Sequence, residues 1–392
     1  MPISENLPPE LRLLLRLLQA GLRAEGTDGL EPPAANLDWT VFDGLVHRHA
    51  VGGFLHHRVP LALKARLPVP VTLRWQETAR KTARRAQTQS GELARLAPAF
   101  ADAGIPLLSL KGPLLARRLY GAPGQRRAGD LDLLVAPENV TRADALLRAA
   151  GCTRTRPDFA LTPRQDRAYR ETQYEFEYVS AASGLRVELL WRLEHLPAST
   201  DLWTRAIPEV LDGRTLLTPP ADVNACYLFQ HGARHGWFRL FWLVDIALLL
   251  RDPAIDWTAL VADARRQGIE RPLLQGAALA HDLLGAGAPA AFTPSAGEQA
   301  AVQALCAEAR RQLAGEADAG DRTVEWCRQL AYRVRLPRAA AAKLAVLRPH
   351  LVSLSSWKMV KLPDPLFGLY HVLTPFLWLW RRAAALRPHR SP

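Results

Sequence analysis

The chain has 392 residues, of which 48% are hydrophobic, a content that supports a packed core and excludes a disordered protein. At roughly 100–200 residues per domain, this length predicts two or three domains. The net charge of +12, supplied mainly by arginine, favours phosphate-rich partners such as nucleoside triphosphates, nucleic acid or anionic lipid. The positive charge is spread along the chain, which is not typical of a dedicated nucleic-acid-binding arm.

Residues 1–103 are predicted to form an N-terminal helical region. Leucines and alanines recur at three- and four-residue spacing over 10–23, 39–49 and 71–103, with arginines on the opposite faces. Prolines at 32–33 and the PVPV sequence at 68–71 separate these helices.

The pattern changes at Gly104. Residues 105–110 form a short apolar run typical of a strand, and Lys-Gly-Pro at 111–113 opens a helix, since proline is well tolerated in a first helical turn. A second strand over 130–135 leads into a helix over 137–151.

Two further strands, over 173–179 and 185–193, are joined by a Ser-Ala-Ala-Ser-Gly turn and predict a hairpin. The segment 104–220 is therefore expected to be a small mixed β-sheet core with helices on one side. The predicted fold class is α+β, with this core between two helical regions.

Residues 221–392 return to a helical pattern and end in an aromatic-rich helix. The stretch 365–380 is almost wholly apolar (PLFGLYHVLTPFLWLW), and Arg381 and Arg382 follow it. It falls short of the ~20 residues that a spanning helix needs, and Pro375 interrupts it. Segment 365–382 is interpreted as a helix buried in a groove of the protein or contacting a partner, or as an attachment to a membrane surface; membrane spanning is the least favoured reading.

The four cysteines, Cys152, Cys226, Cys306 and Cys327, lie far apart without a CxxC pair. Neither a zinc site nor a disulfide framework is expected, and a cytoplasmic location is predicted. The first residues lack a basic leader with a long apolar run, so a secretion signal is not expected either.

The sequence Gly-Asp-Leu-Asp-Leu-Leu-Val at 129–135 is the centre of the functional prediction. Alternate residues of a strand project from the same face, so Asp130 and Asp132 point together. Two adjacent carboxylates repel each other unless a cation lies between them, and ligation by oxygen alone suits Mg²⁺ or Mn²⁺. A solvated strand start with two exposed aspartates is the alternative.

Three neighbouring features support the metal site. Lys111 and Gly112 at a helix N-terminus could hold a phosphate chain, and Arg126 could clamp phosphate oxygens. Glu188 stands in an otherwise apolar strand, where a charge needs a partner, and it is the candidate third carboxylate. Glu175 and Glu177 compete for that role but alternate with aromatic residues as if on one wet face. Each feature also has an ordinary alternative, such as a strand–helix turn or a solvated loop charge.

The block LLSLKGPLLARRLYGAPGQRRAGDLDLLV resembles the uncharacterised nucleotidyltransferase family of the DNA polymerase β superfamily. Members show an apolar strand, Lys-Gly, a helix ending in Tyr, and then Arg-x-x-Gly-Asp-x-Asp-Leu-Leu-Val. The resemblance spans roughly residues 10–280. It implies that Asp130 and Asp132 are metal ligands with Glu188 as the third acidic position.

The resemblance also places Lys111 and Gly112 where the wider superfamily has Gly-Ser at the triphosphate, and Arg126 on the family's arginine. One position departs from the pattern: Leu190 stands where the family commonly has His. This departure weakens a role for a histidine there and leaves the acidic position intact.

His231 and His235 lie four residues apart on one helical face. Because no HExxH arrangement is present, a zinc hydrolase is disfavoured. The segment is expected to pack over the nucleotide cleft, with these histidines or Arg239 near the base or phosphates. Alternatively, the histidines and Asp245 join the helical region to the core.

The sequence thus predicts a nucleotidyltransferase with a two-metal carboxylate site for Mg²⁺ or Mn²⁺, which moves an NMP group from a nucleoside triphosphate to an acceptor. A small molecule, peptide or protein acceptor is favoured over RNA, because no RNA-binding module is recognisable. Two alternatives stay open: a catalytically silent nucleotide-binding or membrane-associated scaffold, and an RNA-binding protein. The oligomeric state is not predicted.

Overall fold

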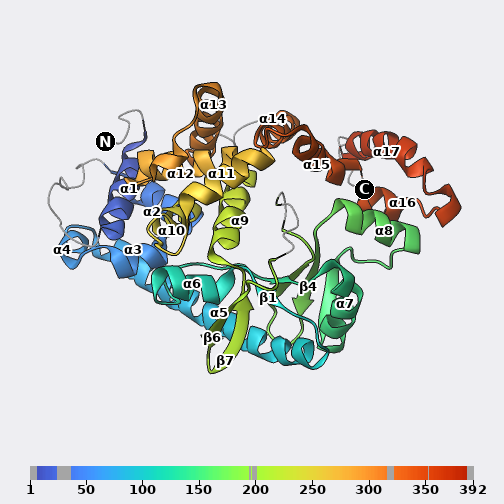
Figure 1. Ribbon diagram of the computed structural model, residues 1–392. Helices are drawn as coiled ribbons and strands as arrows, with labels where there is room; N and C mark the ends of the chain where they lie inside the picture. The colour runs from blue at the N-terminus through green and yellow to red at the C-terminus, as the bar shows by residue number, and fades with distance from the viewer. Residues whose placement is uncertain are drawn as a thin grey trace, which may run out of the picture.

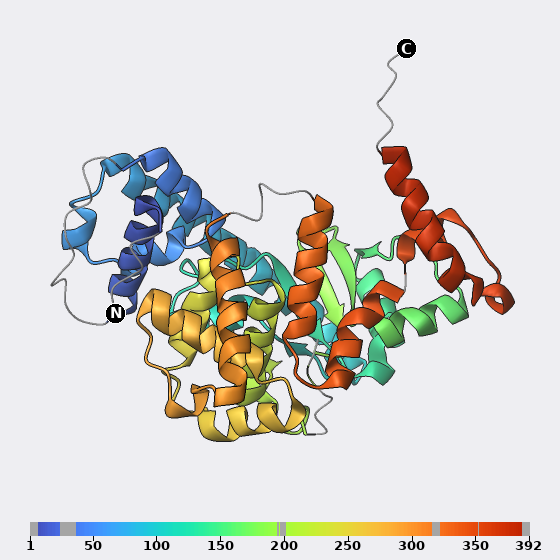
Figure 2. The same ribbon diagram turned by 90° about the horizontal axis from the view of Figure 1, so that it is seen from above.

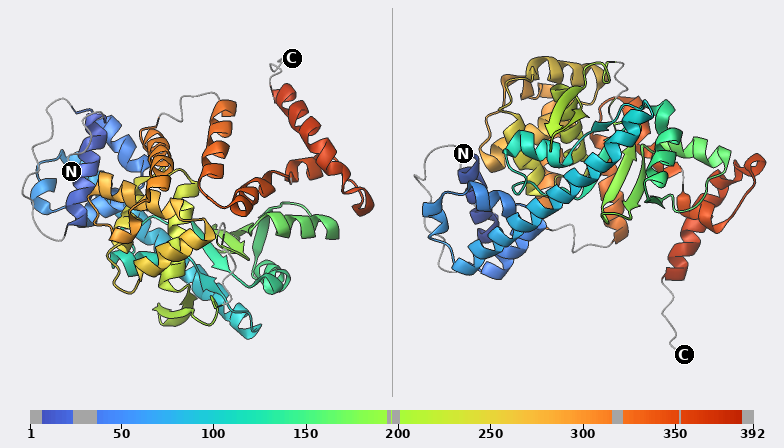
Figure 3. Two further views of the ribbon diagram at one scale, coloured as in Figure 1. Left: turned by 45° about the horizontal axis from the view of Figure 1, so that its top comes forward. Right: turned by 90° about the horizontal axis from the view of Figure 1, so that it is seen from below.

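The computed structural model describes residues 7–23, 37–193, 196, 201–315, 322–351 and 353–385. The N-terminal region is helical and lies at the opposite end of the molecule from the last helices (Figure 3). It contains α1 (Pro9–Leu22), α2 (Trp39–Arg48), α3 (Gly52–Arg58), α4 (Leu61–Lys64) and α5 (Val69–Asp102).

A mixed sheet follows, in the strand order β3-β4-β5-β2-β1-β7-β6. Its strands are β1 (Leu108–Ser109), β2 (Asp130–Leu134), β3 (Cys152–Arg156), β4 (Glu175–Ser180), β5 (Arg186–Leu190), β6 (Ile207–Leu211) and β7 (Arg214–Thr218). The central pair, β2 and β5, is parallel, and β4 and β5 form the antiparallel hairpin expected from the sequence.

Helices connect the strands of this sheet. They are α6 (Gly112–Tyr120), η1 (Pro137–Asn139), α7 (Val140–Ala149) and α8 (Pro163–Thr172). α6 carries proline in its first turn and ends at Gly121, whose left-handed φ of 77° closes the helix. This short helix fixes the position of Lys111, the residue immediately before it.

The rest of the chain is helical. It comprises α9 (Ala221–Arg234), α10 (Leu240–Leu249), α11 (Trp257–Gln267), α12 (Arg271–Leu284), η2 (Ala290–Phe292), α13 (Ala296–Leu313), α14 (Arg322–Arg335), α15 (Ala340–Leu351), α16 (Leu354–Met359), η4 (Asp364–Leu366) and α17 (Leu369–Ala385). α9 to α13 pack beside the N-terminal helices, and α14 to α17 lead away toward α8 (Figure 1 and Figure 2).

Alternation in β2 and β5 separates the two faces of the sheet. Leu131 and Leu133 pack with Val187 and Leu189 in a core beneath α5 and α7. On the other face, Leu134 joins a second core that includes side chains of α9. Helices therefore cover both faces, as Figure 1 shows for α5 and α9. The sequence-based expectation of helices on one side only is wrong, because α9 supplies the second layer from outside the 104–220 segment.

The α+β class with helical flanks is confirmed. The expected helices over 10–23, 39–49 and 71–103 correspond to α1, α2 and α5. The expected strand over 105–110 is reduced to β1. β3, β6 and β7 were not predicted.

The apolar C-terminal stretch forms η4 and most of α17. Leu369, Val372, Phe376 and Trp380 are all exposed on α17, from 46% to 65%. A wholly buried terminal helix is therefore wrong for these side chains. Within the described ranges, no helix combines the length and apolar character needed to cross a membrane. Attachment to a membrane surface or a partner stays a prediction.

Candidate active site

Three acidic residues share one face of the sheet at β2 and β5. The parallel register pairs Asp132 directly with Glu188, and Asp130 with Arg186. Paired residues on neighbouring strands project to the same face, as do residues two apart along one strand. Asp130, Asp132 and Glu188 therefore project toward the helical layer that contains α9.

Burial and mutual repulsion disturb the ionisation of these carboxyl groups. Asp132 is only 1% exposed, whereas Asp130 and Glu188 are half-buried. Burial, followed by the charges of Asp132 and Asp130, raises the pKa of Glu188 to about 10. Burial also raises the pKa of Asp132, although Lys111 opposes that change. A cation bound next to Asp132 and Glu188 would oppose both upward pKa shifts.

Lys111 lies against the acidic residues. Its Nζ atom is 2.9 Å from Oδ1 of Asp132, and its side chain is 10% exposed. Burial alone would lower the pKa of Lys111, but Asp132 and, to a smaller extent, other neighbours raise it well above its ordinary value. The lysine is therefore charged and provides local neutralisation for Asp132.

Gly112 follows Lys111 with a left-handed φ of 72°, which glycine adopts without steric cost. A Cβ atom at this position would meet only Leu131 Cδ2, at 3.8 Å. The first turn of α6 thus presents glycine backbone beside the lysine. Backbone N–H groups at a helix N-terminus are suited to bind phosphate.

The residues fit a hard divalent cation in chemistry and in register. Both carboxylate oxygens of Asp132 are buried without a hydrogen-bond partner among the described residues, and the ion pair with Lys111 supplies the neighbouring positive charge. Oxygen donors are the ligands that Mg²⁺ and Mn²⁺ prefer. However, the described part of the chain contains no three His, Cys, Asp or Glu side chains already gathered closely enough to hold one ion. Shared ligation by all three carboxylates would require side-chain rotation.

The structure places Arg126 in a buried link to the helical region. Its Nε and Nη2 atoms donate to Asp245 of α10 over 2.9–3.1 Å, and Arg126 is 4% exposed. The Tyr120 hydroxyl donates to the same carboxylate at 2.5 Å. Asp245 therefore ties α10 to the last residue of α6 and to the connection between α6 and β2. This agrees with the sequence-based alternative that Asp245 joins the helical region to the core. The Arg126 donors in this contact point to Asp245 and not to an open phosphate site.

His231 and His235 form part of an aromatic cluster that begins beside Lys111. The Lys111 Nζ atom is 5.7 Å from the ring centroid of Tyr227, and the Tyr227 ring is 5.9 Å from that of His231. His235 lies 4.7 Å from His231 and stacks on Trp242 at 5.3 Å.

Burial, followed by nearby cations, holds the pKa of both histidines well below its usual range. They are therefore neutral at physiological pH. A neutral aromatic row beside a lysine is suited to contact a nucleotide base.

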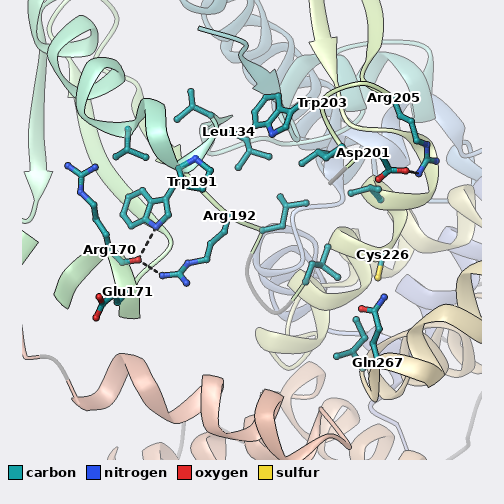
Figure 4. Close-up of a pocket in the computed structure, with 18 of the residues that line it drawn as sticks. Leu134, Arg170, Glu171, Trp191, Arg192, Asp201, Trp203, Arg205, Cys226 and Gln267 are labelled. Carbon is teal, nitrogen blue, oxygen red and sulfur yellow. Dashed lines mark hydrogen bonds and ion pairs between the residues drawn. The ribbon is translucent and has the colours of Figure 1, made fainter. Parts of the chain in front are cut away.

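A large cavity of about 1330 Å³ lies next to the acidic residues, but Asp130, Asp132, Glu188 and Lys111 are absent from its lining. Leu134, two residues after Asp132 on the same strand face, is part of its wall. Figure 4 shows Trp191 and Arg192 on one side of the cavity and Cys226 and Gln267 on the other.

No pattern in the sequence singles out this lining. Its residues come from distant segments, and each looks like ordinary core or surface when read alone. The one local indication of the cavity was the pair Trp191 and Arg192, which directly follows β5, the strand that contains Glu188. Nothing in the sequence marked Tyr227, which contacts Lys111, as a site residue, because an aromatic residue on a helix is ordinarily part of a core.

The comparisons with known proteins agree with the motif. The family model described as an uncharacterised nucleotidyltransferase matches residues 35–285. That range includes the whole sheet, the acidic residues and α9 to α12. Neither a curated protein nor a solved structure matches the chain.

Proposed function

The chain belongs to the uncharacterised nucleotidyltransferase family, and from this premise we propose that it transfers an NMP group from a nucleoside triphosphate to an acceptor with the help of Mg²⁺ or Mn²⁺. The observation that best supports this proposal is the pairing of Asp132 on β2 with Glu188 on β5. Asp130 lies two residues before Asp132 on the same face of β2. Lys111 and the glycine start of α6 lie beside this pair.

Asp130, Asp132 and Glu188 would hold the divalent ion. A bound ion supplies positive charge that stabilises the triphosphate and the departing pyrophosphate. Beside such an ion the carboxyl group of Glu188 would be ionised, because a neighbouring cation favours the charged form. This accounts for three carboxylates on one half-buried sheet face, an arrangement that is unfavourable without a cation.

Lys111 and Gly112 are proposed to bind the β- and γ-phosphates. The amide groups in the first turn of α6 can donate to phosphate oxygens, and the positive end of the helix dipole favours the anion. In the free protein Lys111 is paired with Asp132. With a divalent ion held by the carboxylates, Asp132 would be neutralised without Lys111, and the lysine would then be able to contact phosphate.

The transfer is an in-line substitution at the α-phosphorus. The acceptor oxygen forms a bond to the α-phosphorus, the bond from that phosphorus to the α,β-bridging oxygen breaks, and pyrophosphate leaves. Glu188 accepts the proton from the acceptor oxygen, which requires its ionised form. Most of the rate enhancement is expected from positioning and from stabilisation of charge.

The donor base is proposed to contact the aromatic row of Tyr227, His231 and His235. These rings lead away from Lys111 along one face of α9, in steps of 5.9 and 4.7 Å between centroids. Neutral histidines offer an apolar stacking surface and a hydrogen-bonding edge. Stacking alone discriminates weakly between bases, so each nucleoside triphosphate is a donor to test, with ATP first.

The experiment is transfer of an α-phosphate label from each nucleoside triphosphate to acceptors in a cell extract, with Mg²⁺ or Mn²⁺. The wild type should form a labelled product and release pyrophosphate, and Asp132→Ala should form none. Glu188→Gln should also lose transfer. Glu177→Gln is the matched control, because Glu177 faces Glu188 across the β4–β5 hairpin but is paired with Arg156. Equal activity of Glu188→Gln and Glu177→Gln would contradict the proposed role of Glu188.

A further inference from the structure

The cavity beside the acidic residues has walls from both the sheet and the helical region. Its volume is about 1330 Å³, above the roughly 300–1,000 Å³ of pockets that hold drug-sized ligands. One wall includes the end of β2, α8 and Trp191, and the facing wall is formed by α9 and α11. Figure 4 shows these two sides with the space between them.

Apolar side chains form the floor and walls. Leu134, Val223 and Leu260 come from β2, α9 and α11, and Trp191 follows β5 directly. Trp203 adds a second indole near the top of the view (Figure 4). The Trp191 ring is held in place because its Nε1 atom donates to the Arg170 carbonyl at 3.2 Å. A ligand with an apolar body would remove this surface from water, at about 25 cal/mol per Å².

Charged groups stand mainly where they already have partners. Arg205 is paired with Asp222 at 2.8 Å, and Arg170 with Asp166 at 2.8 Å. Because these charges neutralise each other, a ligand in the cavity would be recognised mainly through the apolar surface and not through a concentrated charge. The lining therefore does not resemble a phosphate or nucleic-acid groove.

The cavity adjoins the proposed site of transfer. Leu134 follows Asp132 by two residues on the same face, a Cα separation of about 7 Å at the usual strand rise. Across the cavity, Cys226 immediately precedes Tyr227, whose ring contacts Lys111. The cavity wall at Leu134 thus lies two positions along β2 from Asp132, although none of the acidic side chains lines the cavity.

We propose that this cavity binds the acceptor, and that the acceptor is an amphiphilic molecule with a bulky apolar body and a hydroxyl group at one end. The inference rests on the proposed nucleotidyl transfer. The apolar body lies between α8 and α9, and the hydroxyl oxygen bonds to the α-phosphorus. Its proton passes to Glu188 and pyrophosphate leaves. A highly polar acceptor such as a sugar or an RNA end does not match this lining.

Filling the cavity tests the binding step without the transfer reaction. Val223 is half-buried on the α9 wall, so Val223→Trp places an indole in the space. Val41→Trp is the matched control, because Val41 is 48% exposed on α2 and is not part of the cavity wall. Circular dichroism and thermal unfolding establish that both variants are folded.

The probe is the fluorescent apolar anion anilinonaphthalene sulfonate. Wild type, Val41→Trp and Asp132→Ala should bind it equally, and Val223→Trp should bind it about tenfold or more weakly, the change that corresponds to about 1.4 kcal/mol. Unchanged probe binding by folded Val223→Trp would contradict binding in this cavity.

Label transfer with a cell extract then tests the acceptor role. The wild-type product should partition into butanol, and Val223→Trp should raise the acceptor KM about tenfold or more, in line with the probe. A labelled product found only in the aqueous phase and formed equally by Val223→Trp would overturn the proposed acceptor class. If the wild type transfers nothing, the proposed function and the acceptor role both fail; the probe result still decides whether the cavity binds apolar ligands.

Discussion

Asp245→Ala should destabilise the protein strongly, because it leaves a buried arginine without its main partner. Arg126 and Asp245 are 4% and 1% exposed, and the pair is joined by bonds of 2.9–3.1 Å. Removal of one member of such a pair typically costs about 3–5 kcal/mol. The loss of the 2.5 Å bond from Tyr120 adds to this effect. Against a usual total of about 5–15 kcal/mol, the change is large.

Urea unfolding at neutral pH measures this loss. The control is Glu77→Ala, because Glu77 pairs with Lys81 on the exposed face of α5 and should show no resolvable change. The double variant Arg126→Met/Asp245→Leu should recover much of the stability, because it removes both buried charges. A loss for Asp245→Ala no larger than that for Glu77→Ala would refute the assignment of Arg126 as a structural link. Reduced nucleoside triphosphate binding by the folded double variant would instead favour the phosphate-clamp interpretation.

Three further predictions concern the core and the nucleotide end of the site. Burial holds the pKa of His49 at about 3, whereas the unfolded side chain binds a proton below about pH 6.5. The free energy of unfolding should therefore fall as the pH drops from about 6.5 toward 3. Within that window, the difference in this free energy between wild type and His49→Gln, measured by urea unfolding, should change by about 1.4 kcal/mol per pH unit. A pH-independent difference would contradict this. Gly112→Ala should cost about 1–2 kcal/mol through its left-handed φ and raise the KM for the nucleoside triphosphate; equal stability and KM would argue against a phosphate cradle there. Lys111→Met should show a larger rise in unfolding temperature on addition of Mg²⁺ than the wild type, since the ion then replaces the lost neutralisation of Asp132, and an equal or smaller rise would count against that role.

The local part of the site was predictable from the sequence. Alternation in Asp-Leu-Asp-Leu indicated a strand with two carboxylates on one face, and the structure has β2 there. Lys-Gly-Pro indicated a helix start, which is α6. Both patterns depend only on residues a few positions apart, so the local sequence is enough to predict the strand and the helix start.

The partners of these residues were less predictable. The pairing of Asp132 with Glu188 joins segments that are 56 positions apart, and only the parallel register of β2 and β5 places the two side chains opposite each other. The link from Arg126 to Asp245 spans 119 positions and was weighed only as a general connection. The cavity has no local signal, because its walls meet only after the helical region packs on the sheet.

One omission had a local signal. Asp212-Gly213 separates β6 and β7, and both residues have positive φ, 50° and 77°, as a type I′ hairpin turn requires. This dipeptide between two alternating runs is a strong hairpin indicator. β3 differs, since its residues Cys-Thr-Arg-Thr-Arg are mostly exposed and carry little apolar alternation. Its place in the sheet follows from pairing with β4.

The central claim is that Asp130, Asp132 and Glu188 together hold a divalent ion. Electron paramagnetic resonance titration of Mn²⁺, with a non-hydrolysable nucleoside triphosphate analogue present, measures this binding directly and does not depend on an acceptor. Glu188→Gln should bind Mn²⁺ at least about tenfold more weakly than the wild type, as should Asp132→Ala, whereas Glu177→Gln should match the wild type. Unchanged Mn²⁺ affinity in both Asp132→Ala and Glu188→Gln would contradict the account.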